Sequence, residues 1–413
     1  MRKMDAYKAY LFLSGAQAFL FALIFTASSV YQITVVGLTP LQLVLVGTFL
    51  ETICFVFEIP TGIVADVYSR RLSIIIGVLL IGVGFFIEGW FPSFAMVLLA
   101  QVGWGMGATF TSGATEAWVA DELGEQRTNE AFLRSSQVRS LTGIVGLVTG
   151  MLISTFFGPA TAVWGGGLGM FVLGLVLIVI MPETGFKATP RTERSSWGTL
   201  FATFREGMGV VRTSSLLVTL LLIEVIFGLF SEGYDRLSNA HVISNFRFPM
   251  LLGMSLSPVV WFGLLEIVGR FINSGFTEIV KRKLNMNENR AIARALTLIE
   301  AALIVSLLAF ALAPNFAVVV IAMLGVGICR SLSGPIFSAW INQQIQSDDS
   351  HVRATIFSMF GQANAIGQIG GGPIVGAIGN RSLRLALTVS ALLLTPTLAL
   401  YNRPANVQKA IAE

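Results

Sequence analysis

The chain has 413 residues, of which 54% are hydrophobic and only 12% are charged, and its mean hydropathy is +0.76. A soluble domain needs a much larger share of polar surface, so this composition excludes one. Inside a bilayer every backbone N–H and C=O group needs an internal partner, which leaves helices and closed barrels as spanning structures. The apolar segments of this chain have the length of membrane helices, about 20 residues or more.

Twelve apolar segments of that length follow one another along the chain. They lie at residues 8–33, 40–65, 73–91, 94–120, 131–157, 161–181, 214–241, 250–279, 290–312, 315–345, 353–379 and 382–402. The first segment is too long for the core of a signal peptide and has no cleavage pattern, so we expect it to be retained. The sequence therefore predicts an all-α integral membrane protein with twelve transmembrane helices.

Basic residues gather on alternate connections between these segments. If the N-terminus is cytoplasmic, 21 of the 27 Lys and Arg residues lie in or beside cytoplasmic segments. Only Arg247, Arg381 and Arg384 then fall in outer loops, a bias that indicates two cytoplasmic termini. We expect a multi-pass protein of the plasma membrane, which in a bacterium is the inner membrane. The net charge of +4 is attributed to this topology and to anionic lipid rather than to nucleic acid.

The two halves of the chain resemble each other at an offset of 222 residues. The segment 103–118 in the fourth predicted helix matches the segment 325–340 in the tenth, with four identities in register. After a further shift of two residues, Gly143 and Gly146 of the fifth helix align with Gly367 and Gly370 of the eleventh. The pattern indicates an internal duplication.

The duplication divides the chain into two predicted six-helix bundles. We expect an N-terminal bundle at 1–181, a cytoplasmic linker at 182–213 and a C-terminal bundle at 214–413. Within the linker, residues 197–211 could form a helix that lies on the inner membrane surface. Two bundles related by an axis along the membrane normal would enclose a site between them at mid-membrane.

A short charged loop, Gly62-Ile-Val-Ala-Asp66-Val-Tyr-Ser-Arg70-Arg71, separates the second and third predicted helices. This loop resembles the signature of the major facilitator superfamily, and twelve spans in two halves extend the resemblance over the whole chain. Ser69 and Val67 replace the usual Gly and the usual first Arg of that signature. The resemblance implies two pseudo-symmetric bundles and a transporter that works by alternating access.

The same resemblance implies a gate at the inner membrane face. Asp66 would face the start of the eleventh helix near residues 351–353, where the positive helix end favours an anion. Arg70 or Arg71 would reach an acid at the foot of the fourth helix. The alternative is a solvated loop that only sets topology. The residues of this gating motif are Gly62, Asp66, Arg70, Arg71, Asp121 and Glu122.

Three short runs resemble the drug-exporter branch of that superfamily, particularly its macrolide-efflux-like and tetracycline-efflux-like members. They lie at residues 58–62, 116–122 and 231–236. The chain departs from this branch at Gln101, where proton-coupled members carry Arg, and at 143–150, which lacks the proline of the antiporter signature. The resemblance implies proton-coupled multidrug efflux, an activity that confers antibiotic resistance.

Carboxylates inside predicted spans are candidates for proton coupling, because an ionised side chain at mid-bilayer costs about 2.5 to 3.5 kcal/mol on insertion scales. A coupling carboxylate must bind a proton and face both sides of the membrane in turn. Glu116 and Glu224 fit this role best. Glu58 and Glu51, which share one face of the second helix, are further candidates, although Glu58 could equally be a packing residue tied to the gate.

Other charges within the spans are expected to form pairs. Glu266 and Arg270 have the spacing of an ion pair within one helix. Asp235 and Arg236 are adjacent and diverge, so each is expected to meet another helix. Glu232 and Asp235 could then anchor an outer gate, or only cap the aqueous vestibule.

Arg330 lies in a predicted cavity-lining helix and needs a counter-anion. Glu116 or Glu224 is the candidate, unless an anionic substrate takes that place. Aromatic residues beside one or two acids would accept amphipathic cations by packing and by cation–π contact, whereas contact with lipid or other helices is the competing interpretation for each aromatic. The predicted cavity residues are Gln17, Phe21, Tyr31, Gln101, Trp104, Phe110, Phe227, Glu232, Tyr234, Asp235, Arg330 and Trp340.

These observations predict a secondary active transporter, with proton-coupled efflux of amphipathic drugs or related small molecules as the leading hypothesis. The rivals are an uptake or uniport carrier for a specific metabolite or lipid and, from another class, a non-transporting receptor or accessory subunit. An enzyme is not expected, because we find no phosphate loop, metal-spaced His or Cys cluster, or paired nucleophile and base. We expect no cofactor and no metal, and a monomer whose partners are its substrate, protons and lipid. Cys54 and Cys329 are expected to be small buried hydrophobes.

Overall fold

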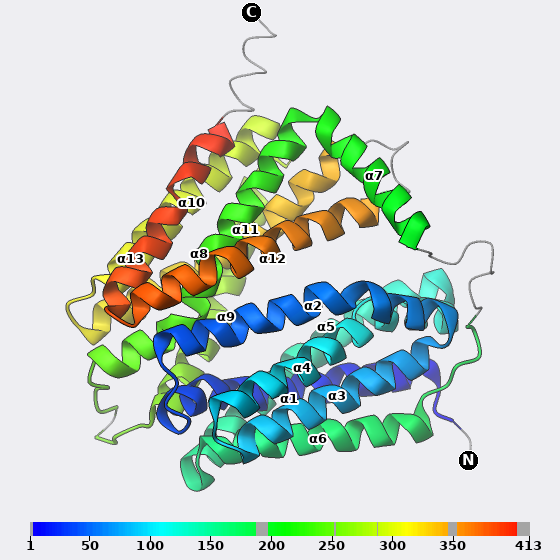
Figure 1. Ribbon diagram of the computed structural model, residues 1–413, viewed down its shortest axis with the longest axis horizontal. Helices are drawn as coiled ribbons and strands as arrows, with labels where there is room; N and C mark the ends of the chain where they lie inside the picture. Colours follow the sequence, from blue (N-terminus) through cyan, green and yellow to red (C-terminus); the bar gives the residue numbers. More distant parts are fainter. Residues whose placement is uncertain (1–2, 187–196, 252, 287, 346–352, 403–413) are drawn as a thin grey trace, which may run out of the picture. The chain divides into compact units, whose positions relative to one another are not determined.

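The computed structural model describes residues 3–186, 197–251, 253–286, 288–345 and 353–402 (Figure 1). Thirteen helices account for almost all of these residues, and no strand occurs among them apart from an isolated bridge between Leu251 and Met254. The helices are α1 (Ala6–Thr34), α2 (Pro40–Val67), α3 (Arg70–Trp90), α4 (Phe94–Thr111), α5 (Ala114–Phe157), α6 (Pro159–Ile180), α7 (Trp197–Thr213), α8 (Ser215–Asn245), α9 (Pro258–Lys283), α10 (Asn289–Ala311), α11 (Phe316–Gln344), α12 (Arg353–Gly379) and α13 (Leu383–Leu393). The predicted all-α membrane fold is confirmed.

Within the described residues, eleven helical segments are long and apolar enough to cross a membrane. The predicted span at 353–379 corresponds to α12, a 27-residue helix that is not among these eleven segments. Its glycines and its amide side chains account for its lower hydropathy. The predicted span at 250–279 begins later, as α9 at Pro258, because the preceding residues form a turn in which Gly253 has a φ of +78°.

The fourth and fifth predicted spans are separated by a backbone kink rather than by a loop. Gly113 precedes α5 with a φ of +70°, and Gly124 interrupts α5 with a φ of +73°. Only glycine adopts such angles without strain, so both positions break the helical path. The membrane-crossing segments are consequently Phe94–Gly124 and Gln126–Phe157.

Many of the helices are capped at their N-terminus by a side chain. The side chain of the residue before the helix accepts a hydrogen bond from a backbone N–H group of the first turn, which would otherwise have no partner. Ser69, for example, accepts from the backbone N–H of Leu72 at 2.9 Å. The residues that cap in this way are Asp5, Ser69, Ser93, Ser214, Asn315 and Ser382.

The chain forms two compact units. The first contains residues 1–38, 49–195 and 256–263, and the second contains 39–48, 196–255 and 264–413. The predicted boundaries at 181 and 213 lie close to the division at 195, but the start of α2 and the start of α9 each belong to the unit formed mainly by the other half of the chain. Residues 187–196 of the predicted linker lie outside the described residues.

The first unit is held together by close pairs of helices. In Figure 1, α3 and α6 run side by side, and α1 packs against α5. A Cβ at Gly146 of α5 would overlap the backbone carbonyl of Phe19, and a Cβ at Gly150 would lie 2.8 Å from the carbonyl of Leu23. Small residues four apart therefore let the α5 backbone approach α1, as is common in membrane helix pairs.

The second unit repeats this contact between α12 and α8. A Cβ at Gly367 would overlap the carbonyl of Val225, and a Cβ at Gly371 would lie 2.7 Å from the carbonyl of Leu229. In contrast, nothing lies within 4 Å of a Cβ at Gly370. By this packing, Gly367 is the counterpart of Gly146, so the alignment of Gly146 with Gly370 was wrong by three residues.

The start of α2 packs inside the second unit. A Cβ at Gly376 of α12 would lie 3.0 Å from Cβ of Val44 and 3.1 Å from Cα of Leu41. The backbone N–H of Leu41 donates to Oδ1 of Asn380 at 3.0 Å. Gly376 thus lets the backbones of α12 and α2 lie close together, as Gly367 and Gly371 do for α12 and α8.

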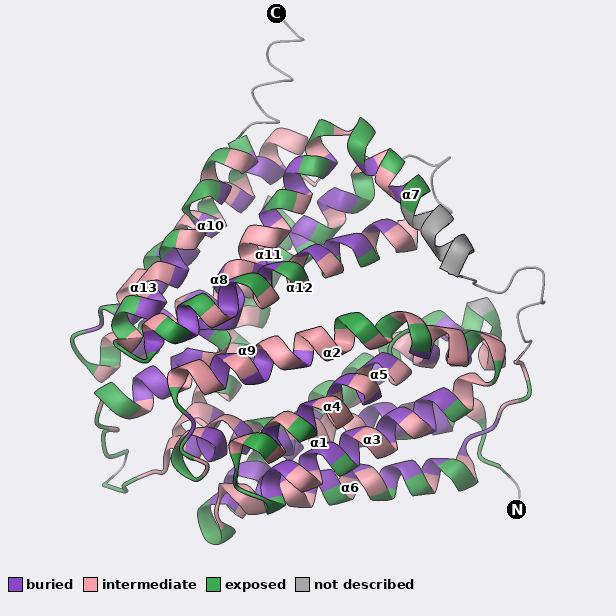
Figure 2. Cartoon of the chain, in the orientation of Figure 1, coloured by how far each residue is buried: buried purple, intermediate pink, exposed green. Residues whose placement is uncertain are grey.

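The surfaces of both units carry large apolar side chains. In Figure 2, buried and exposed residues alternate along the same helices. Phe156 is 73% exposed, and Leu298 and Ile321 are each 71% exposed. Exposure of such residues on many helices is expected where lipid, rather than water, surrounds a protein.

Candidate functional site

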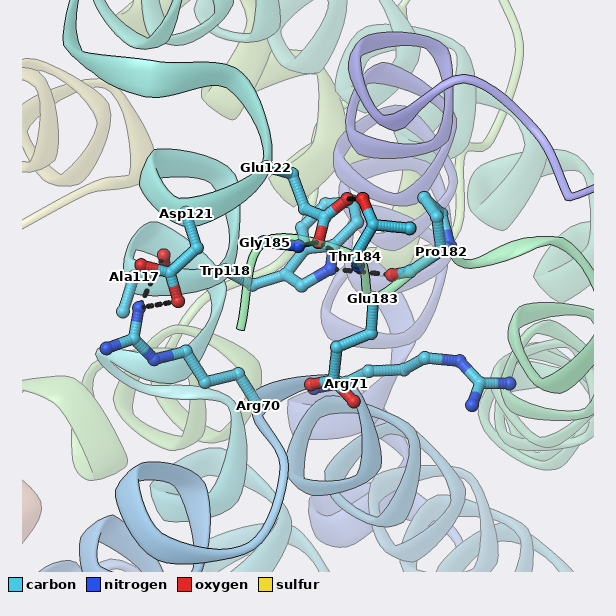
Figure 3. A network of polar contacts seen from close by, with 10 residues as sticks. All are labelled: Arg70, Arg71, Ala117, Trp118, Asp121, Glu122, Pro182, Glu183, Thr184 and Gly185. Carbon is cyan, nitrogen blue, oxygen red and sulfur yellow. Dashed lines mark hydrogen bonds and ion pairs between the residues drawn. The ribbon is translucent and has the colours of Figure 1, made fainter. Parts of the chain in front are cut away.

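The basic pair that begins α3 is divided between two sets of partners, all within the first unit. The guanidinium of Arg70 forms an ion pair with Asp121 of α5 and donates to the carbonyl of Ala117 at 2.7 Å. The side chain of Arg71 points the opposite way and donates to the carbonyl of Ile178 in α6 (Figure 3). Of the pairings left open by the sequence, the structure therefore contains the one between Arg70 and Asp121.

An acid that follows α6 holds the start of α3. Glu183 accepts a hydrogen bond from the Ser69 hydroxyl at 2.7 Å and from the Arg71 backbone N–H at 2.9 Å. A carboxylate at a helix N-terminus is favoured by the helix dipole as well as by these donors. Sequence reasoning missed Glu183, because it assigned residues 182–213 to a linker.

Glu122 fixes the same post-α6 segment to α5. Its carboxylate accepts from the Thr184 backbone N–H and hydroxyl and from the Gly185 backbone N–H at 2.6 Å. The buried indole of Trp118 donates to the carbonyl of Pro182 at 2.9 Å (Figure 3). We call the set Ser69, Arg70, Arg71, Ala117, Trp118, Asp121, Glu122 and 182–185 the inner clamp.

The remaining two members of the predicted gating motif lie at the end of α2. Asp66 is exposed, and nothing lies within 4 Å of a Cβ at Gly62. The predicted partner region of Asp66, residues 351–353, includes positions outside the described residues. The structure thus brings Arg70, Arg71, Asp121 and Glu122 into one clamp.

A second polar cluster of the first unit centres on Glu88, near the end of α3. Its carboxylate accepts from Gln32 at 2.8 Å, from Ser28 at 3.2 Å and from Gln101 at 3.4 Å. Tyr31 donates to the backbone carbonyl of Glu88 at 2.6 Å. Tyr31 and Gln101 were predicted to line a cavity, but both are buried here among α1, α3 and α4. The sequence did not lead us to Glu88, because we considered acids in the middle of the predicted spans and Glu88 lies near the end of one.

Two other predicted cavity residues of the first unit, Phe21 and Trp104, form an aromatic cluster with Phe25. Phe21 and Phe25 stack with ring centroids 5.6 Å apart, and Phe25 lies 5.1 Å from Trp104. Phe25 is 44% exposed, so this cluster reaches the surface of the unit. Gln17 and Phe110 are both partly buried.

The proton-coupling candidates differ in their surroundings. Glu116 and Glu58 are exposed, and Glu51 is partly buried. Glu224 of α8 is partly buried and accepts a hydrogen bond from the Asn364 side chain at 2.8 Å, and Asn364 accepts in turn from Gln368 at 2.7 Å.

A buried acid that sequence reasoning missed lies close to Glu224. Glu300 of α10 is 2% exposed, accepts from the Thr397 hydroxyl at 3.2 Å and is within electrostatic range of Glu224. Within the described part of the chain, no ion pair reaches either carboxylate, and the donors that face them are neutral. Glu300 could have been found by its position in the predicted span 290–312.

Glu232 of α8 is buried and lies against Gly47 of α2. It is 3% exposed and accepts from Nε of Arg236, one turn later on the same helix, at 2.9 Å. A Cβ at Gly47 would overlap the Glu232 carboxylate. We expected Arg236 to meet another helix. Its ion pair lies within α8, because the i to i+4 spacing places the Glu232 carboxylate within its reach, but its Nε also lies against Gly47 of α2.

Arg330 of α11 pairs with Asp235 of α8 through both terminal guanidinium nitrogens, Nη1 and Nη2. The prediction that Glu116 or Glu224 supplies the counter-anion was wrong, because Asp235 occupies that place. The guanidinium carbon also lies 5.8 Å from the ring centroid of Phe227 and 5.9 Å from that of Phe230. The side chains of Arg330 and Asp235 are 30% and 42% exposed.

Two further cavity candidates belong to helix packing. The indole of Trp340 is fully buried and donates to Asn289 at 2.8 Å, and Tyr234 is buried against Phe310. Trp340 and Trp118 are matched by the internal repeat. Both are buried, and each donates a hydrogen bond to a neighbouring segment. The predicted intrahelical pair of Glu266 and Arg270 is present on the exposed face of α9.

A family model and a relative of known sequence match most of this chain. The family model described as the Major Facilitator Superfamily matches residues 10–372. A relative described as the uncharacterized MFS-type transporter YxaM of Bacillus subtilis (strain 168) is 25% identical over 355 residues, which cover 82% of this chain and 80% of that protein.

Solved structures match the chain over nearly its full length. The nucleoside transporter NupG, in a mutant form, matches with a TM-score of 0.75 and 14% identity, covering 96% of this chain and 99% of that one. A POT family transporter in complex with a thioalcohol-conjugated peptide matches with a TM-score of 0.71 and 12% identity, covering 100% and 99%. At these identities the likeness concerns the fold alone.

Proposed function

The chain belongs to the Major Facilitator Superfamily, and we propose that it is a secondary active transporter that couples proton movement to the efflux of amphipathic small molecules. The observation that carries the proposal is the pair of acids, Glu224 and Glu300, that face only neutral donors within the described part of the second unit. We further propose that the protein works as a monomer in the plasma membrane with both termini cytoplasmic.

The proton role follows from the cost of burying charge. An ionised carboxylate in an apolar interior needs a basic partner, or it must bind a proton. Asn364 and Thr397 supply hydrogen bonds to Glu224 and Glu300 but no positive charge. Two acids within electrostatic range of each other also oppose simultaneous ionisation. We therefore assign proton binding to this pair.

The size of the available driving force suits such a transporter. A proton that enters the cell yields about 2.3 kcal/mol per 100 mV of membrane potential. Each unit of pH difference adds about 1.4 kcal/mol. One proton can thus support a substrate gradient of roughly tenfold to several hundredfold.

The inner clamp is proposed to stabilise one state of the transport cycle. Arg70, Asp121 and Glu183 join the start of α3 to α5 and to the segment after α6. These are contacts between helix ends, which can open without disrupting the helix packing in the core of the unit. Asp66 is proposed to complete the gate in another state.

The amphipathic character of the substrate is proposed from the aromatic cluster of Phe21, Phe25 and Trp104. Aromatic faces bind flat apolar groups and cations without demanding one shape. The competing hypothesis is that the same architecture carries out uptake, or uniport, of a single metabolite or lipid.

Transport by proteoliposomes with an imposed pH gradient tests the proposal. Ethidium and 2-naphthoate serve as a cationic and an anionic amphipathic probe. We expect saturable movement of at least one probe, driven by the gradient, abolished by an uncoupler and lost in Glu224→Gln. Movement of both probes at the rate of protein-free liposomes, or movement unaffected by the uncoupler, would contradict proton-coupled transport of amphipathic molecules.

A further inference from the structure

The ion pair between Arg330 and Asp235 has two unequal members. The guanidinium of Arg330 lies over the rings of Phe227 and Phe230, and these contacts do not involve Asp235. Asp235 has Arg330 as its hydrogen-bonding partner among the described residues and is the more exposed of the two, at 42% against 30%. Arg330 is therefore the fixed member, and Asp235 is the member that can be replaced.

The contact between them is that of an arginine and a carboxylate in parallel alignment. Each carboxylate oxygen of Asp235 accepts from a different terminal nitrogen of Arg330. This fork geometry is specific for planar anions such as carboxylates. The Asp235 carboxylate thus stands where the carboxylate of a small molecule would lie.

The surroundings favour a ligand with an apolar body. Both residues belong to membrane-crossing helices, α8 and α11, yet both side chains are partly exposed. The neighbouring rings of Phe227 and Phe230 meet edge to face, with centroids 5.3 Å apart. Phe230 is fully buried, whereas Phe227 is partly exposed, so a flat apolar group attached to the carboxylate could pack against the Phe227 ring.

From these observations we infer that Arg330 is the binding site for an amphipathic carboxylate, which displaces Asp235 from the guanidinium. Phe227 and Phe230 hold Arg330 in place, and the partly exposed Phe227 contacts the apolar part of the ligand. The displaced Asp235 turns to water, since its side chain is already partly exposed. This inference rests on the proposed transport function, because it names the charge of the molecule that is transported.

Binding to the purified full-length protein tests the inference without requiring transport. The probes are 2-naphthoate, 2-naphthalenemethanol and 2-naphthylmethylammonium, which share one ring system and differ in charge. Titration calorimetry should give the tightest binding for 2-naphthoate. Arg330→Gln should weaken that binding by at least about tenfold, the effect of losing a hydrogen bond to a charged group. The neutral probe should be affected much less.

Asp235→Asn gives the more decisive result. If Asp235 competes with the ligand, removing its charge should tighten 2-naphthoate binding several-fold, although the ion pair is lost. Arg270→Gln, which breaks the exposed pair with Glu266, is the matched control and should change nothing. Unchanged 2-naphthoate binding in Arg330→Gln, weaker binding in Asp235→Asn, or a preference for the ammonium probe would each overturn the inference.

The two proposals fail in different ways. Binding of 2-naphthoate that depends on Arg330, in a protein without gradient-driven transport, would contradict the proposed function alone. Gradient-driven transport of ethidium with no Arg330-dependent binding of 2-naphthoate would contradict this inference alone.

Discussion

Gly47 of α2 lies so close to Glu232 of α8 that a Cβ at position 47 would overlap the Glu232 carboxylate. The carboxylate is buried and already paired with Arg236, so it has little room to retreat. A side chain at position 47 would therefore force the Glu232 carboxylate and the Arg236 guanidinium to move. The contact ties the start of α2 to the second unit.

Gly47→Ala should for this reason destabilise the protein, by about 1 to 3 kcal/mol for an overpacked buried site. Gly334→Ala is the matched control, because nothing lies within 4 Å of a Cβ at that helical position and alanine favours a helix. Thermal unfolding of the purified variants compares them. A Gly47→Ala protein as stable as the control would contradict the close contact.

A second pair of glycines tests the register of α12. Gly367→Ala should lower the unfolding temperature, because the new Cβ would overlap the Val225 carbonyl, which the α8 backbone holds in place. Gly370→Ala, three residues later, meets nothing within 4 Å and should be tolerated. The reverse order of stability would restore the alignment of Gly370 with Gly146.

The inner clamp predicts unequal roles for two neighbouring arginines. Arg70→Gln removes the ion pair with Asp121 and the bond to Ala117, whereas Arg71→Gln leaves the backbone bond to Glu183 intact. We expect Arg70→Gln to slow transport more. A double-mutant cycle with Asp121→Asn should give a coupling free energy of about 1 kcal/mol, as expected for a partly exposed pair. Additive effects of the two substitutions would show that the pair contributes nothing.

Proton binding by the buried acids can be observed without a substrate. Infrared spectra of the protein in lipid should contain the C=O stretch of a protonated carboxyl, which an ionised carboxylate lacks. Glu300→Gln should remove part of this band, and Glu224→Gln should change it as well, because the two groups interact. Glu266→Gln, at an exposed ion pair, is the control. A spectrum without a protonated carboxyl band from neutral to mildly acidic pH would leave the pair without a proton role.

The sequence was sufficient for the features that depend on composition and local spacing. Segment length and hydropathy located the membrane helices, and the i to i+4 spacing of Glu266 and Arg270 gave their ion pair. The glycines of the fifth and eleventh predicted helices indicated the internal duplication, but their spacing alone could not choose between Gly367 and Gly370 as the counterpart of Gly146. A helix repeats every turn, so several registers fit one pattern.

Features that depend on which helices meet could not be obtained in this way. Glu300 and Thr397 are about a hundred residues apart in sequence, and Glu183 lies in a segment whose composition resembles a linker. The partner of Arg330 was assigned wrongly, because Asp235 and Glu224 lie about three turns apart on nearly the same face of α8, and the choice between them depends on the height at which α11 meets α8. Tyr31 and Trp340 have aromatic rings that suit a cavity equally well, and only burial places them in the helix packing.

Simultaneous recording of proton and substrate movement tests the central claim most directly. Proteoliposomes that contain a trapped pH-sensitive dye would be loaded with whichever probe the protein transports, and internal pH would be followed as the probe leaves. We predict proton movement in the opposite direction, in a fixed ratio to the probe, in the wild type and in Glu266→Gln. The double variant Glu224→Gln, Glu300→Gln should lose the proton movement. Probe movement at the full rate with no change of internal pH in the wild type would contradict proton coupling.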